Sequence, residues 1–212
     1  MRWIIPWICW LSMCLPAAAD GETPGEFDYY VLALSWSPSW CATEGDARGS
    51  DQCHPRHDHG WILHGLWPQY HRGWPAYCRS SERPPSRRMT AEMADIMGSS
   101  GLAWHQWKKH GTCSGLSAAD YFALSRRAYA AVNRPEILRR LDRPVRLPAE
   151  LVEQAFLEAN PGWAPEMLTI TCRDGHIAEA RLCLSRDLQP VPCGRDVIAD
   201  CRLRDALLLP VR

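Results

Sequence analysis

The apolar residues of this chain gather in short runs near its two ends and in helix-like patterns between them. Residues 29–36 and 61–67 form apolar runs that are short enough for buried strands. Residues 167–172 and 176–184 show the same β-type character near the C-terminus. Strands at both ends with helices between them predict an α+β fold, in which several helices pack against a central antiparallel β-sheet.

Helix-start signals mark the middle of the chain. Thr90 is a candidate N-cap for a helix over 91–98, and Ser117 is a candidate N-cap for the next helix. Pro148 opens a third helical pattern over 149–159, because proline suits the first turn of a helix. No internal repeat or long linker separates these patterns, so the sequence predicts one domain.

Composition narrows the class of protein. A chain of 212 residues is long enough for one domain with a sizeable core. Its 24 basic and 24 acidic residues balance, so any binding of a polyanion must come from a local cluster of charge. The 11 tryptophans and 10 cysteines indicate a compact, cross-linked protein of an oxidising compartment.

Residues 1–19 predict a signal peptide, with a basic start, an apolar stretch and small residues before the cleavage site. The mature protein would then be a single domain over 20–212, secreted or periplasmic. Cys14 raises the alternative of a lipoprotein, but Met13 before it fits poorly to the small residue that lipidation signals prefer.

Eight cysteines remain after the predicted cleavage, an even number that suits four disulfides. They are Cys41, Cys53, Cys78, Cys113, Cys172, Cys183, Cys193 and Cys201. None belongs to a Cys-x-x-Cys pair, which argues against zinc-ribbon and thioredoxin-like folds and favours a structural role.

Residues 104–113 hold the densest group of chemically active side chains. If residues 104–110 are helical, Gln106 and His110 lie at i,i+4 and Lys109 joins the same side. Gly111 then suits the left-handed position that closes a helix. The resulting polar face is positive whenever a histidine is protonated, and a phosphate would fit it.

Two segments, His-Gly-Leu-Trp-Pro at 64–68 and His-Gln-Trp-Lys-Lys-His-Gly-Thr-Cys at 105–113, resemble the active-site segments of the ribonuclease T2 family. The run Leu-Ala-Leu-Ser-Trp-Ser-Pro at 32–38 is similar to the first core strand of that family. The resemblance implies a secreted endoribonuclease. It also implies the disulfides Cys41–Cys53, Cys78–Cys113, Cys172–Cys201 and Cys183–Cys193.

The chemistry of RNA cleavage explains these residue types. The 2′-hydroxyl attacks the phosphate, so the reaction needs a base for its proton, an acid for the 5′-oxygen and cations for the phosphate. Imidazole titrates near the working pH, and each such group contributes about 10²–10⁴ in rate. The resemblance implies His110 as the base and His64 as the acid, with His105 and Lys109 on the phosphate.

No metal or other cofactor is required by this scheme. Trp67 offers a face for base stacking, which is worth about 1–3 kcal/mol per base and tolerates many sequences. We therefore expect single-stranded RNA as the partner, a 2′,3′-cyclic phosphate product and little base specificity, while the need for a 2′-hydroxyl excludes DNA. We further expect a monomer without stable membrane association.

Gln106 departs from the resemblance, because the family usually has a glutamate there. Its amide still donates a hydrogen bond to a phosphoryl oxygen, so we predict catalysis and expect Gln106→Glu to preserve or improve it. The alternative is a catalytically impaired, secreted RNA-binding or protein-binding member. Gln69 follows the Trp-Pro pair, at a position that contacts the base in many relatives, and it leaves the base preference open. Trp74 or Tyr77 would either provide a second stacking face or pack within a loop.

Each residue also has a plainer interpretation. His64 alone would be a hydrogen-bonded core histidine, His110 a helix C-terminal histidine and Trp67 a core residue. We assign Trp104 and Trp107 to packing. A separate alternative is a metal-dependent hydrolase built on the histidines His54, His57, His59 and His64.

Overall fold

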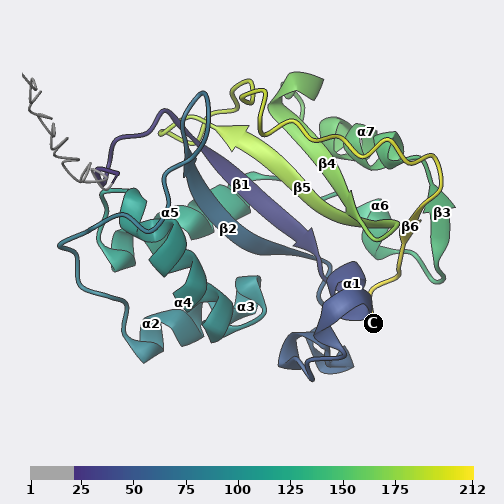
Figure 1. The fold of residues 1–212 in the computed structure, drawn as a ribbon. Helices are drawn as coiled ribbons and strands as arrows, with labels where there is room; N and C mark the ends of the chain where they lie inside the picture. Colours follow the sequence, from purple (N-terminus) through teal and green to yellow (C-terminus); the bar gives the residue numbers. More distant parts are fainter. Residues whose placement is uncertain (1–21) are drawn as a thin grey trace, which may run out of the picture.

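The computed structural model describes residues 22–212, so the predicted signal peptide and the Cys14 alternative lie outside the described residues. One sheet forms the centre of the molecule (Figure 1). Its strands are β1 (Tyr29–Trp36), β2 (Trp61–Gln69), β3 (Val145–Leu147), β4 (Leu168–Arg173), β5 (His176–Leu184) and β6 (Ala206–Leu208). The helices are α1 (Ser37–Trp40), α2 (Arg87–Glu92), α3 (Ala94–Met97), α4 (Ser100–Lys109), α5 (Ala118–Ala131), α6 (Glu136–Arg139) and α7 (Ala149–Ala159).

The sheet has the order β2-β1-β5-β6-β3, and β4 also pairs with β5. The α+β prediction is confirmed, and the four predicted strands are present with ends within two residues of those expected. The sheet is mixed, however, since β5 and β6 pair in parallel while the other described pairs are antiparallel. A parallel pair needs a long connection, which residues 185–205 provide.

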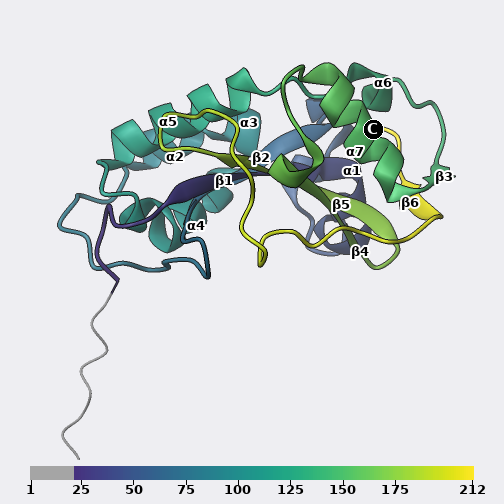
Figure 2. The same cartoon turned by 90° about the horizontal axis from the view of Figure 1, so that it is seen from above.

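The two faces of the sheet have different functions in the fold. Leu32 and Leu34 of β1 are fully buried in the main core. Helices α5 and α7 cover this core along one side of the sheet (Figure 2). Residues alternate along a strand, so Val31 and Ser35 point to the opposite face, where they line a cavity. The core therefore lies on one face and the candidate site on the other.

Two of the three predicted helix starts are confirmed. Ser117 accepts a hydrogen bond from the backbone N–H of Asp120 at 3.2 Å and caps α5, and Pro148 directly precedes α7. The start at Thr90 was wrong. Ser86 accepts from a backbone N–H and caps α2 instead, so the helix begins earlier and breaks after Glu92. None of the helices within residues 22–212 is long and apolar enough to cross a membrane.

Four disulfides cross-link the chain, with sequence separations from 10 to 35 residues. They are Cys41–Cys53, Cys78–Cys113, Cys172–Cys201 and Cys183–Cys193, the same partners that the family resemblance implies. Cys78–Cys113 closes the longest loop of the four, with a sequence separation of 35. In a chain-entropy account, closing such a loop destabilises the unfolded state, so these bonds stabilise the fold.

Candidate active site

His64 projects from a β-bulge in strand β2. The register pairs Ala33 with Gly65 and Leu34 with Leu63, so His64 has no partner across the strand pair. A bulge of this kind inserts one extra residue and redirects side chains. It allows Leu63 and Leu66 to enter the core while His64 and Trp67 both face the cavity.

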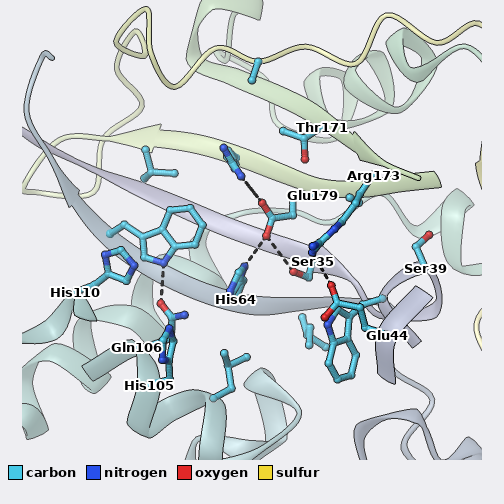
Figure 3. Close-up of a pocket in the computed structure, with 18 of the residues that line it drawn as sticks. Ser35, Ser39, Glu44, His64, His105, Gln106, His110, Thr171, Arg173 and Glu179 are labelled. Carbon is cyan, nitrogen blue, oxygen red and sulfur yellow. Dashed lines mark hydrogen bonds and ion pairs between the residues drawn. The ribbon is translucent and has the colours of Figure 1, made fainter. Parts of the chain in front are cut away.

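A buried carboxylate holds one side of the His64 ring. His64 Nδ1 lies 2.5 Å from Glu179 Oε1, and Ser35 Oγ donates to the same oxygen at 3.4 Å (Figure 3). Arg181 donates to the other oxygen of Glu179 through Nε at 3.0 Å and Nη2 at 2.8 Å. Burial alone would raise the pKa of Glu179, but the hydrogen bond and charge of His64, together with Arg181, lower that pKa to about 2.

His110 lies at the C-cap of α4, and its environment is very different. Its side chain is buried, and its ring stacks on Trp67 with centroids 5.2 Å apart and planes at 22°. Burial and the positive charge of Lys109 lower the pKa of His110 to about 3. His110 is therefore neutral at neutral pH.

Trp67 connects the two histidines. Its ring centroid lies 5.1 Å from that of His64 in an edge-to-face arrangement, and it stacks on His110. Its indole N–H donates to Gln106 Oε1 at 2.7 Å, which leaves the amide NH₂ of Gln106 as the free donor. A Cβ on Gly65 would overlap both Trp67 and Gln106, so glycine is required beside this hydrogen bond.

His105 and Lys109 complete the cationic side of the site from α4. His105 is exposed and Lys109 is half-buried, and both line the same cavity as His64. Burial and the nearby charge of Lys109 lower the pKa of His105. Lys108, which we expected to be solvated, is exposed and does not line the cavity.

One cavity of about 850 Å³ contains the predicted site. The predicted residues that line it are His64, Trp67, His105, Gln106, Lys109 and His110. These side chains come from segments about forty residues apart in the sequence, on β2 and at the end of α4 (Figure 3). The structure thus brings together all six predicted catalytic and substrate-binding residues.

A match to a known family decides the identity of the fold. The family model described as "Ribonuclease T2 family" matches residues 27–193. The chain belongs to this family. It is 46% identical over 116 residues to a ribonuclease of Aeromonas hydrophila, a match that covers 55% of this chain and 50% of that relative. It is 32% identical over 120 residues to a probable ribonuclease of Haemophilus influenzae, covering 51% and 44% of the two chains. These matches span about half the length of the curated relatives.

Solved structures show the same T2 fold. The RNase-related protein from Calystegia sepium superposes with a TM-score of 0.65 at 21% identity, covering 88% of this chain and 98% of that one. RNase NT in complex with 5′-AMP superposes with a TM-score of 0.64 at 22% identity, covering 88% and 100%. At this identity the likeness establishes the shared fold.

The end of α4 differs in one respect from our prediction that Gly111 closes the helix in a left-handed conformation. Gly111 does not adopt a left-handed conformation, but begins a 3₁₀ turn over Gly111–Cys113. A Cβ at Gly111 would overlap Trp107, so the glycine is needed for close packing. The Cys78–Cys113 disulfide and the hydrogen bond from Tyr77 N to Lys109 O at 2.9 Å hold this end of α4.

The other aromatic and amide candidates differ in burial and in whether they line the cavity. Trp107 is buried as expected, but Trp104 is 39% exposed, so its assignment to packing was wrong. Trp74 is 54% exposed and lines the cavity, whereas Tyr77 is exposed outside it. Gln69 is buried and also lines the cavity.

The four histidines of the metal-dependent alternative do not form a ligand cluster. His57 pairs with Asp51 at 3.0 Å and stacks on His59, while His64 bonds to Glu179. Within residues 22–212, one group of three potential metal ligands lies close together: Glu22, Cys78 and Cys113. Its two cysteines form a disulfide with each other. The donor geometry therefore does not support this alternative.

Sequence reasoning missed Glu179 and Arg181, which lie in the T2 domain 115 and 117 residues beyond His64. Neither belongs to a motif. One signal was present: two residues of opposite charge, Glu179 and Arg181, alternate within the strand at 176–184, which is apolar apart from these two and His176. Such residues on one face of a buried strand need polar partners.

Proposed function

We propose that this protein is a metal-independent endoribonuclease that cleaves single-stranded RNA through a 2′,3′-cyclic phosphate. The observation that carries the proposal is the contact of two imidazoles, His64 and His110, with one indole in a single cavity. Membership of the ribonuclease T2 family supports the proposal, and so does its similarity to relatives that are named a ribonuclease and a probable ribonuclease. RNase NT, a structural relative, was solved with 5′-AMP, a nucleotide.

His110 acts as the general base. It is neutral, so it accepts the proton of the 2′-hydroxyl as that oxygen attacks the phosphorus. A pKa near 3 makes His110 a weak base in the free protein. When an anionic phosphodiester binds in the cavity, its negative charge offsets the neighbouring positive charge. This raises the pKa of His110 and makes it a stronger base.

His64 acts as the general acid. A carboxylate partner suits an imidazolium, and the exposed side of the ring faces the cavity, where the 5′-oxygen leaves. Its proton moves to that oxygen as the phosphorus–oxygen bond breaks. If the cyclic phosphate is later hydrolysed, a water molecule attacks the phosphorus, and the two histidines exchange their roles as acid and base.

Three side chains stabilise the phosphorane. Lys109 supplies positive charge, His105 offers a ring N–H donor, and the Gln106 amide donates from a fixed orientation because its oxygen is held by Trp67. Trp67 and the exposed Trp74 provide faces for bases. Stacking does not read base edges, which accounts for low base specificity. The predicted signal peptide at 1–19 would export this domain to the periplasm or the medium.

The test is to incubate purified protein with a single-stranded RNA oligomer in EDTA and to analyse the new 3′ ends. We expect cleavage with 2′,3′-cyclic phosphate ends and no cleavage of the matching DNA. A double variant His64→Ala, His110→Ala serves as the contamination control. Binding of RNA without cleavage would contradict the proposal and identify an impaired family member, the alternative that Gln106 raises.

A further inference from the structure

Glu179 reaches His64 across an intervening strand. Strand β1 lies between β2 and β5, and Ser35 of β1 pairs with Glu179 in the sheet register. Because serine is short, the two longer side chains meet above it at 2.5 Å. This arrangement depends on three strands and is not a local feature of the His64 motif.

Both oxygens of Glu179 have partners. Oε1 accepts from His64 and Ser35, and Oε2 accepts from two nitrogens of Arg181. The carboxylate is therefore fixed in place and remains ionised. Arg181 itself lies over the Trp67 ring, with its guanidinium carbon 5.6 Å from the ring centroid. The hydrogen-bond network of Glu179 therefore also contacts Trp67, which lines the cavity.

We propose that Glu179 is the positioning residue that gives His64 its role as the acid, an inference that rests on the proposed function. An imidazolium has two N–H groups. Glu179 accepts one of them at Nδ1, so Nε2–H is the one left to face the 5′-oxygen. When the phosphorus–oxygen bond breaks, the Nε2 proton moves to the leaving oxygen, His64 becomes neutral, and Glu179 takes up no proton.

The charges around His64 divide by element. Strand β5 contributes Glu179 and Arg181, while α4 and its C-cap contribute His105, Lys109 and His110. Strand β1 contributes only the uncharged Ser35 among the polar groups in contact. Glu179 is thus the one negative group on these elements that touches His64, while Arg181 and Lys109 are the positively charged side chains of the same elements that line the cavity.

The first test compares Glu179→Gln with Glu150→Gln, which alters an exposed carboxylate of α7 outside the cavity. We expect kcat on RNA to fall by at least about 10-fold in Glu179→Gln, up to the roughly 10²–10⁴ of losing an acid. We expect the loss to vanish on a nucleoside 3′-(p-nitrophenyl phosphate), whose leaving group needs no proton. The alkaline limb of the pH–rate profile should move to lower pH.

A merely structural role would lower turnover of both substrates equally and leave that limb in place, and this result would overturn the inference. If Glu179→Gln does not fold, Glu179→Asp retains the charge with a shorter reach, and we expect the same selective loss in weaker form. The second test is NMR titration of the His64 ring. We expect Glu179→Gln to move its protonation to lower pH and Glu150→Gln to leave it unchanged.

The titration separates this inference from the proposed function. If the wild type does not cleave RNA but Glu179→Gln moves the His64 titration, the endoribonuclease proposal fails while the coupling of the pair stands. If the wild type cleaves RNA and neither the titration nor the leaving-group dependence responds to Glu179→Gln, the inference fails alone.

Discussion

His64 and His110 touch the same indole from different surroundings. His64 is half-exposed on a strand, with Nδ1 held by Glu179. His110 is buried at a helix end, and its Nδ1 has no hydrogen-bond partner among the residues that the structure describes. Identical side chains thus have opposite environments, since one is hydrogen-bonded to a carboxylate while the other is buried and kept neutral.

The difference lies in which part of the fold supplies each neighbour. Burial is the main cause of the low pKa of His110, and the charges that add to it come from Lys109 and His105 on α4 and from His64 on β2. The carboxylate that holds the His64 ring comes from β5, across the sheet. The neutral base therefore depends on the packing that buries His110 against Trp67, and the acid depends on the carboxylate that β5 places beside His64.

The largest expected effect comes from removing either ring. His64→Ala and His110→Ala should each lower kcat/KM on RNA by about 10²–10⁴. On a substrate with a p-nitrophenolate leaving group, which needs no proton, the kcat/KM of His64→Ala should return toward that of the wild type. The kcat/KM of His110→Ala should stay low. His71→Ala, at an exposed histidine outside the cavity, is the matched control. Equal recovery of both variants would show that the two roles are not divided as proposed.

Lys109→Ala should lower kcat by about 10²-fold, because a preorganised charge on the developing phosphorane is lost. Lys109 also lowers the pKa of His110, so the acidic limb of kcat/KM should move to higher pH in this variant. The exposed neighbour Lys108→Ala should leave both quantities near wild type. An unchanged acidic limb in Lys109→Ala would mean that this cation does not act on His110.

Acid should weaken the fold through His110. Its folded pKa of about 3 lies below the ordinary histidine value of 6.5, so between these two pH values the unfolded chain binds a proton that the folded protein does not bind. The free energy of unfolding should fall by up to about 1.4 kcal/mol per pH unit as pH drops below 6.5 toward 4.5. Urea unfolding at several pH values measures this slope.

His110→Gln removes the titrating ring, and we expect a smaller slope in the same window. Glu179, whose pKa is lowered to about 2, adds stability above pH 4.5 and loses it only below that value, so its effect falls in a separate range. An equal slope for wild type and His110→Gln between pH 6.5 and 4.5 would contradict a neutral, buried His110.

The smallest expected effect is that of Gln106→Glu. A carboxylate accepts the Trp67 N–H as the amide oxygen does, so activity should be unchanged or improved by no more than about 10-fold. Its negative charge should raise the pKa of His110 and move the acidic limb to higher pH. Gln154→Glu, at an exposed position of α7, is the control. An inactive wild type that Gln106→Glu restores would identify an impaired enzyme.

Much of the fold was predictable because its signals are local. The β1 run and the caps of α5 and α7 depend on residues within one element, and the structure contains these elements where expected. The parallel β5–β6 pair was not predictable, since β6 is three residues long and its pairing depends on the path of a long loop. The start of α2 was missed because Ser86 competed with Thr90 as the cap.

The sequence by itself identified six of the side chains that meet in the cavity, because two compact motifs carry them. Only the tertiary structure decided what surrounds them: the bulge that turns His64 toward Trp67, and the carboxylate of Glu179 across β1. The physical reason is that the charge of an imidazole depends on burial and on neighbours within a few ångströms. Those neighbours come from strands far apart in the chain, and folding alone brings them together.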